Sequence, residues 1–153
     1  MSHSSCLYKH ILVGLDLSSE ATFVLNKAVK IASACGAQLS IAHVLEPITF
    51  GYGGDMPMDI SEAQALQVHK AEQALQYFTK NTDFPIKQEH VLVGKPATEL
   101  HFLAQQESAD LIIVGSHGRE GFALLLGSTP NSVLHGARCD VLAVFVDANA
   151  TGP

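Results

Sequence analysis

A glycine-rich stretch, residues 115–130, contains the residues of this chain best suited to bind an anion. Gly115 and Gly118 permit a close backbone approach and positive φ angles. Gly127 and Ser128 would open the next helix, whose unpaired N–H groups attract phosphate. The spacing predicts either a phosphate-binding turn or a strand-to-helix connection that needs small residues only for its turns.

Other polar residues offer weaker catalytic or metal-binding patterns. Ser116 and His117 are a possible nucleophile and base, but neighbours in sequence rarely face each other as a catalytic triad requires. The sequence Gly94-Lys95 lacks the flanking residues of a P-loop, and the histidines show no His-x-x-x-His spacing. We therefore predict no catalytic residue and no metal site within the protein itself.

Length and composition predict one soluble domain spanning residues 1–153, with loose ends at 1–8 and 147–153 and a flexible loop at 46–58. The hydrophobic share of 47% is enough for a compact core. A net charge of −6 argues against a nucleic-acid-binding surface, which needs clustered Lys and Arg.

Cysteine usage and hydropathy favour the cytoplasm. Cys6, Cys35 and Cys139 are odd in number and widely spaced, so we expect neither a disulfide framework nor a metal knuckle. The first residues contain no apolar signal core, and no apolar run approaches the ~18 residues needed to cross a membrane. We expect a protein of the reducing cytosol that does not bind membranes.

Short apolar runs rich in branched residues alternate with longer segments of helical period. The expected strands are residues 11–15, 39–45, 90–93, 111–114 and 140–146. The expected helices are residues 18–35, closed by Gly36, then 59–78, then a helix that begins at Pro96 and one that Ser128 or Thr129 caps. This repeated βαβ pattern predicts an α/β fold with a parallel sheet and right-handed crossovers.

Several motifs at these spacings together resemble the universal stress protein family. They are residues 8–18, 42–44, 109–118, 127–128 and 139–144. The resemblance implies a Rossmann-like, single-domain open sheet of five parallel strands in the order 3-2-1-4-5, of the adenine nucleotide alpha hydrolase type, with helices on both faces. It also implies a ligand crevice between the first and fourth strands, where the strand order reverses.

The nucleotide-binding branch of the family implies roles for individual residues. Asp16 would accept hydrogen bonds from the adenine or ribose edge, and the Val44 backbone would read the adenine. Apart from the family, Arg119 is the most plausible cation to meet a phosphate, although an exposed loop Arg is more often only solvated. The rest of the expected site is Gly14, Leu15, Gly115, His117, Gly118, Gly127, Ser128 and Thr129. The implied ligand is ATP or another adenine nucleotide, with Mg²⁺ as its accompanying ion.

Simpler interpretations stay open beside these roles. Asp16 could only stabilise a turn before a helix, and His117 could only be a turn residue. The segment from Arg119 to Leu126 has eight residues, whereas the ATP-binding branch has nine between its glycines. Pro130 also removes one backbone donor near the expected helix start.

Three function classes follow from the resemblance. The first is a non-catalytic stress-response protein that binds an adenine nucleotide. The second is an interaction or chaperone-like stress protein whose crevice is empty, and the third is a slow ATPase. The sequence names no protein partner.

The segment 140–146 predicts homodimerisation. It would form an edge of the sheet in the implied strand order, and it contains no Lys, Pro or inward-pointing charge to block pairing. Antiparallel pairing of identical strands about a two-fold axis would cover this edge, as the family resemblance also implies. Alternatively, the tail 147–153 folds back over it.

Overall fold

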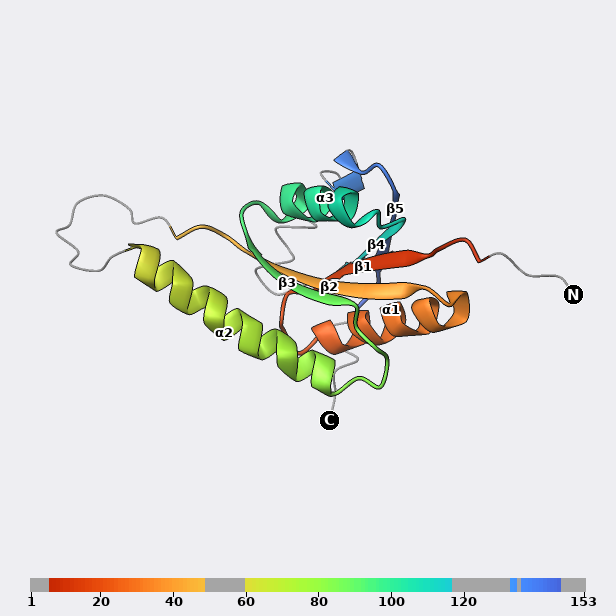
Figure 1. Ribbon diagram of the computed structural model, residues 1–153, viewed down its shortest axis with the longest axis horizontal. Coiled ribbons are helices and arrows are strands. Elements are labelled where there is room, and N and C mark those ends of the chain that lie inside the picture. Colours follow the sequence, from red (N-terminus) through yellow and green to blue (C-terminus); the bar gives the residue numbers. More distant parts are fainter. Residues whose placement is uncertain (1–5, 49–59, 117–132, 135, 147–153) are drawn as a thin grey trace, which may run out of the picture.

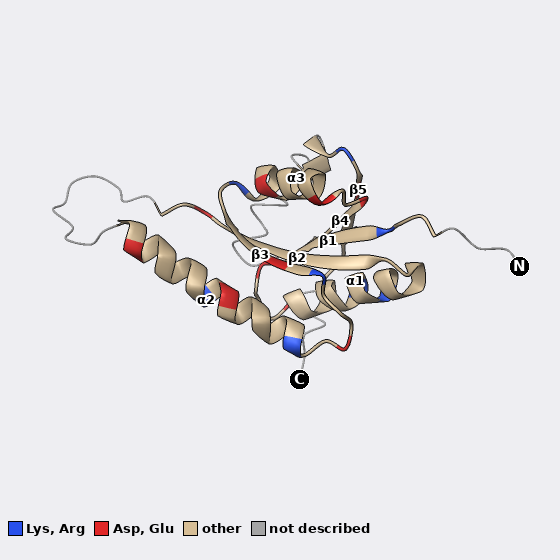
Figure 2. Ribbon diagram, viewed as in Figure 1, with Lys and Arg blue, Asp and Glu red and all other residues tan. Residues whose placement is uncertain are grey.

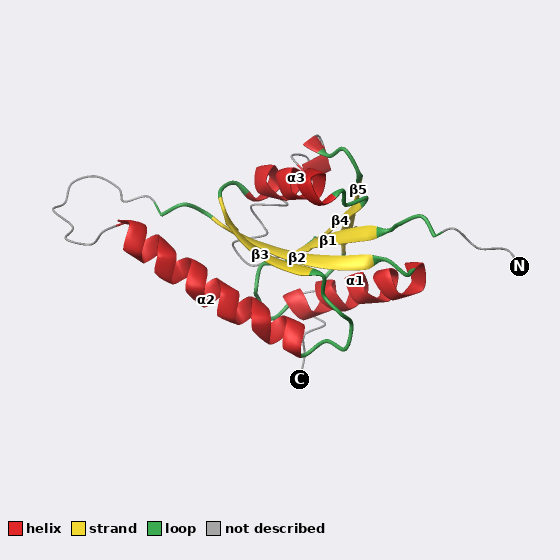
Figure 3. Ribbon diagram, in the orientation of Figure 1, coloured by secondary structure: helices red, strands yellow, loops and turns green. Residues whose placement is uncertain are grey.

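The computed structural model describes residues 6–48, 60–116, 133–134 and 136–146. Within them, strands and helices alternate along the chain as far as β4 (Figure 3). The strands are β1 (His10–Gly14), β2 (Gln38–Leu45), β3 (Gln88–Val93), β4 (Leu111–Gly115) and β5 (Asp140–Val144). The helices are α1 (Ala21–Cys35), α2 (Ile60–Lys80) and α3 (Pro96–Glu107).

The five strands form one parallel sheet in the order β3-β2-β1-β4-β5, as the family resemblance implied. The chain winds outward from β1 through β2 to β3, and then returns to the other side of β1 to form β4. The strand order therefore reverses between β1 and β4. At such a reversal, the segments that follow the two strands run to opposite sides, and this leaves room for a ligand between them.

Helices cover both faces of the sheet (Figure 1). Helices α1 and α2 lie on one face and α3 lies on the other. Ile11 and Val13 belong to the apolar cluster on the α1 side, whereas Leu12 belongs to the cluster on the α3 side. Each fully buried side chain of this size stabilises the fold by about 1.5–3 kcal/mol, so β1 is anchored from both faces.

Gly36 ends α1 as predicted. Its φ of 63° is in the left-handed region, where glycine is favoured because it lacks a Cβ. The N–H of Ala37 then donates to the carbonyl of Ala32 at 2.9 Å, and the N–H of Gln38 donates to the carbonyl of Lys9 at 2.9 Å. This compact turn delivers β2 directly alongside β1.

A disulfide joins Cys6 to Cys35, so the expectation that the cysteines would not pair was wrong. Cys35 is the last residue of α1, and α1 runs back along β1 toward the segment that precedes it. The two Cα atoms consequently lie 5.0 Å apart despite a sequence separation of 29. Pairing depends on this return of the chain, which the spacing of the cysteines does not reveal.

Polar side chains link α3 to the amino ends of the central strands. His10 is 4% exposed, and its Nδ1–H donates to the carbonyl of Glu107 at 3.1 Å. The hydroxyl of Ser40 donates to Nε2 of His10 at 2.8 Å. The Nε2–H of His90 donates to Oε1 of Glu107 at 2.6 Å. Hydrogen-bonded side chains therefore connect α3 to the strands at this end of the sheet.

Lys and Arg are interspersed with Asp and Glu over the described elements and form no continuous basic stripe there (Figure 2). Among the described helices, none is long and apolar enough to cross a membrane.

Candidate functional site

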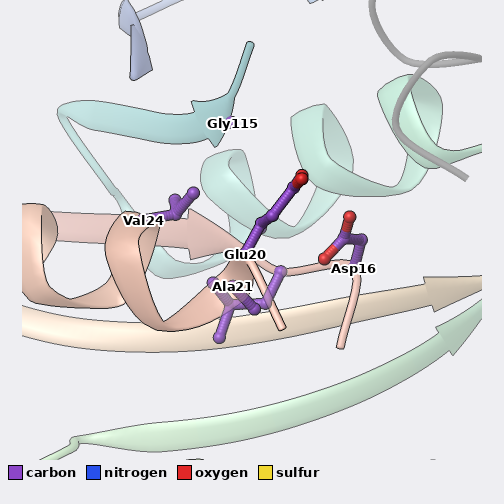
Figure 4. A pocket seen from close by; sticks show the side chains of 7 residues that line it. Asp16, Glu20, Ala21, Val24 and Gly115 are labelled. Carbon is purple, nitrogen blue, oxygen red and sulfur yellow. The ribbon is translucent and has the colours of Figure 1, made fainter. Parts of the chain in front are cut away.

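The carboxyl ends of β1 and β4 meet at a small cavity (Figure 4). Four residues of the predicted site line it, and three of them, Gly14, Leu15 and Asp16, lie about a hundred positions before the fourth, Gly115. The lining comprises Gly14, Leu15, Asp16, Glu20, Ala21, Val24 and Gly115. Its volume of about 10 Å³ is room for roughly one water molecule. The cavity marks the floor of the crevice expected where the strand order reverses.

Gly14 has a packing reason for lacking a side chain. A Cβ at this position would lie 3.1 Å from Cδ1 of Leu100, a buried residue of α3. Gly14 therefore lets α3 approach the end of β1 closely. This requirement is structural and would exist without any ligand.

Asp16 holds the turn between β1 and α1. Its Oδ1 accepts hydrogen bonds from the backbone N–H of Ser18 at 2.9 Å and from the Ser18 hydroxyl at 2.6 Å. Asp16 therefore does stabilise this turn. Both bonds use Oδ1, so Oδ2 takes part in neither and can still accept a hydrogen bond or bind a cation.

Leu17, which lies between Asp16 and Ser18, has a φ of 62°, which is uncommon for a residue other than glycine. The left-handed conformation costs roughly 1–2 kcal/mol in such a residue. The hydrogen bonds of Asp16 to Ser18 bracket Leu17 and offset this cost. Backbone strain held in this way often accompanies a functional site.

His43 lies beside this turn and was missed as a site residue. Its Nδ1–H donates to the carbonyl of Leu15 at 2.7 Å. Burial lowers the pKa of His43, while the bond to Leu15 and the charge of Asp16 act in the opposite direction. The neutral ring then carries its lone pair on Nε2. The motif Ala42-His43-Val44 at a strand end was the available signal.

The backbone of Val44 faces the crevice side of β2. The carbonyl of Ala42 accepts a hydrogen bond from the N–H of Leu15 at 2.9 Å, near the end of β1. Backbone groups two residues apart on a strand point the same way, so those of Val44 also point toward the β1 side, beyond where β1 ends. The Val44 side chain packs with the cluster on the α3 side of the sheet.

Glu20 was also missed, and it is the most unusual group in the cavity. The residue is 7% exposed, and its Oε2 has no hydrogen-bond partner among the described residues. Glu20 immediately precedes α1, where sequence patterns usually indicate a capping side chain, but its carboxylate makes no capping hydrogen bond. In Figure 4 the side chain extends away from the helix into the space near Asp16 and Gly115.

The remaining predicted residues are His117, Gly118, Arg119, Gly127, Ser128 and Thr129, and they lie outside the described residues. In the part of the chain that the structure describes, no group of three or more His, Cys, Asp or Glu side chains is arranged to hold a metal ion.

A second cavity, of about 110 Å³, lies between α3 and the segment before β5. Its lining includes Arg138 and the free cysteine, Cys139. Burial is the largest influence on the Cys139 thiol and raises its pKa, as do the charges of Asp140 and Asp110. Because the thiolate is the reactive form, Cys139 is a poor nucleophile at neutral pH.

Comparison with known proteins identifies the family of this chain. The sequence model of the universal stress protein family matches residues 7–144. The chain belongs to the universal stress protein family. Universal stress protein A homolog 1 of Coxiella burnetii is 37% identical over 141 residues, covering 91% of this chain and 97% of the homolog.

Solved structures of this family share the architecture. Universal stress protein UspA from Lactobacillus plantarum superposes with a TM-score of 0.67 at 28% identity, covering 90% of this chain and 97% of that one. A universal stress protein crystallised in complex with cAMP gives a TM-score of 0.59 at 29% identity, covering 90% of this chain and 96% of that one.

The lowered pKa of His43 predicts acid sensitivity. The unfolded chain takes up a proton at His43 below about pH 6.5, the ordinary histidine value, whereas the folded protein resists doing so. Stability is therefore complete above this pH and is lost as the pH falls toward the lower folded pKa.

Urea unfolding at pH 7.5 and pH 5.5 measures this effect. We expect His43→Gln to lose less stability between the two pH values than the wild type does. The control His69→Gln changes an exposed histidine of α2 and should behave like the wild type. An identical acid loss in His43→Gln and wild type would show that His43 has no such role.

Proposed function

We propose that this protein is a non-catalytic stress-response protein that binds an adenine nucleotide over the carboxyl ends of β1 and β4. The observation that carries the proposal is the set of hydrogen-bonding groups facing this crevice. Asp16 keeps Oδ2 outside its turn bonds, and the backbone of Val44 faces the end of β1. A carboxylate and a backbone strand edge together suit the hydroxyls of ribose and the edge of a purine.

A relative supports the choice of ligand. The universal stress protein of 29% identity was crystallised with cAMP, an adenine nucleotide. In this chain we propose ATP or another adenine nucleotide, accompanied by Mg²⁺, with Gly115 beside the ribose. The phosphates would meet residues His117, Gly118, Arg119, Gly127, Ser128 and Thr129.

The size of the cavity limits how the nucleotide binds. Ligand pockets commonly enclose about 300–1,000 Å³, far more than the about 10 Å³ between Asp16, Glu20 and Gly115. The nucleotide would therefore lie across the strand ends and not inside a preformed chamber. Its binding would order groups around it, and the bound state would be the signal.

Catalysis is not part of the proposal. Phosphoryl transfer needs a group that positions the attacking water and usually a metal ion. Around the described crevice, Asp16 is held in its turn and Nδ1 of His43 is bonded to Leu15. Slow ATP hydrolysis is consequently the third candidate, behind an interaction protein with an empty crevice.

Substitution of Asp16 tests nucleotide binding. A hydrogen bond to a charged group contributes about 1.5–3 kcal/mol, so Asp16→Ala should weaken binding of ATP or AMP by about 10- to 100-fold. Isothermal titration calorimetry measures the change. Ser18→Ala is the control, because it removes the same hydroxyl bond within the turn but leaves the Asp16 carboxylate in place.

We expect Ser18→Ala to bind within about threefold of the wild type, which corresponds to less than 1 kcal/mol. If Asp16→Ala and Ser18→Ala weaken binding equally, Asp16 acts only through the turn. If the wild type gives no heat with millimolar ATP, ADP or AMP, the crevice is not a nucleotide site and the interaction protein becomes the better function.

We also propose a homodimer formed through β5. This strand is one edge of the sheet, and the carbonyl of Val144 accepts a hydrogen bond from the N–H of Ser116 at 2.7 Å. Backbone groups of Val144 thus face β4, and those of Ala143, which alternate with them, face outward. If the β5 strands of two copies pair in antiparallel fashion around Ala143, each copy covers the exposed β5 edge of the other.

Proline at position 143 tests the dimer. Ala143→Pro removes an outward N–H without removing a bond to β4, so it should shift the protein from dimer to monomer. Ala143→Thr keeps the N–H and should remain dimeric. Light scattering over a concentration series gives the masses. A wild-type protein that stays monomeric at tens of micromolar would contradict this assembly.

A further inference from the structure

Glu20 is a buried residue, and one oxygen of its carboxylate lacks a hydrogen-bond partner in the described part of the chain. Its Oε2 has no hydrogen-bond partner among the described residues, and the residue is 7% exposed. A charge removed from water in this way is strongly unfavourable unless a cation or hydrogen-bond donors compensate it. The residues that line its cavity include no Lys, Arg or His side chain. A partner for Oε2 of Glu20 would therefore come from outside the described lining.

The adjacent helix does not supply that partner. Glu20 has backbone angles of φ −78° and ψ −17°, and no capping hydrogen bond forms between its side chain and the first N–H groups of α1. Its backbone N–H instead donates to the hydroxyl of Ser18 at 3.2 Å. The main chain of Glu20 belongs to the turn that Asp16 organises, while its carboxylate is directed into the cavity (Figure 4).

The cavity contains a second carboxylate, that of Asp16. Two anionic groups around a space of about 10 Å³ leave room for one small ion or one water, and not for an organic group. They also disfavour a bare phosphate, because like charges repel strongly where water is excluded. A nucleotide phosphate could approach this floor only if a cation lay between.

We propose that Glu20 and Asp16 together hold one divalent cation of the Mg²⁺ type, which links them to a phosphate of the bound nucleotide. This inference rests on the proposed nucleotide binding. Mg²⁺ prefers oxygen ligands and is typically held by one or two carboxylates together with substrate phosphates and water. Glu20 supplies Oε2, and Asp16 supplies Oδ2, which its turn does not use. A carboxylate oxygen has two lone pairs, so Oδ2 of Asp16 can bind the cation and still accept one hydrogen bond from the nucleotide.

Two protein carboxylates are an incomplete ligand set. The described residues accordingly offer no group of three acidic, histidine or cysteine ligands that would hold a metal alone. The cation and the nucleotide should therefore bind cooperatively, each raising the affinity of the other by the same factor. Glu20 would make the protein selective for the metal complex of a nucleoside phosphate over the free phosphate.

Calorimetric titration with ATP, in Mg²⁺ and separately in EDTA, tests this selectivity. The wild type should bind ATP at least about tenfold more tightly with Mg²⁺, a difference of about 1.4 kcal/mol. Glu20→Gln keeps the shape but removes the charge, so its affinity should be nearly the same in both buffers. Glu89→Gln makes the same substitution at an exposed position of β3 and should retain the wild-type ratio.

Stability gives a second readout that needs no ligand. Without nucleotide, Glu20→Gln should melt at the same temperature as the wild type or higher, because a neutral amide replaces an uncompensated charge. A clearly lower melting temperature would mean that Glu20 has a structural partner and would overturn the inference. Glu20→Asp keeps the charge but shortens the side chain, and it should lose part of the Mg²⁺ preference.

The outcomes separate the two proposals. If Glu20→Gln binds ATP with the full wild-type dependence on Mg²⁺, the cation site is wrong and nucleotide binding stands. If ATP binds the wild type equally well in Mg²⁺ and EDTA, the cation site is also wrong. If no variant binds ATP in either buffer, both proposals fail together.

Discussion

The position of β1 at the centre of the sheet is the constraint on which the rest of this structure depends. Its side chains are buried under helices on both faces, and its backbone is bonded to β2 on one side and β4 on the other. Such a strand cannot shift without disrupting both layers. The chain therefore leaves β1 at a fixed point, and the turn from Leu15 to Ser18 begins where the strand order reverses.

Each end of the sheet buries a glutamate with one oxygen that has no hydrogen-bond partner among the described residues. At the amino ends, Glu107 accepts a hydrogen bond from His90 on Oε1, and the ring of His10 lies 3.5 Å from its Oε2. At the carboxyl ends, the lining of the Glu20 cavity contains no histidine or other basic side chain, and Leu17 holds an uncommon φ. Backbone strain and a carboxylate without a basic neighbour thus coincide at the end where a ligand would offset them.

Sequence patterns predicted the parallel α/β class, and the family resemblance implied the strand order; both are confirmed. Unbroken apolar runs such as Leu111–Val114 indicate strands buried on both faces, and the end of α1 at Gly36 follows from glycine's freedom to adopt positive φ. The predicted end of the last strand was too late, because β5 stops at Val144. Apolar residues continue to Val146, so composition could not mark the point where pairing with β4 ends.

The site was predicted less completely than the fold. Family motifs brought Asp16 and Gly115 to one crevice, but Glu20, His43 and the pairing of Cys6 were missed. Each depends on where one side chain points after the chain has turned back, and periodicity carries no such information. Glu20 resembles an ordinary residue at a helix start, and only its burial without a partner distinguishes it.

The central claim is that the ends of β1 and β4 form the ligand site. Nuclear magnetic resonance of ¹⁵N-labelled protein, titrated with ATP in the presence of Mg²⁺, tests it most directly. The account predicts the largest amide shifts at Gly14, Leu15, Asp16, Val44 and Gly115, with little change at Ser108 and Cys139, which line the second cavity. Shifts confined to that second cavity, or no shifts at millimolar ATP, would contradict the account.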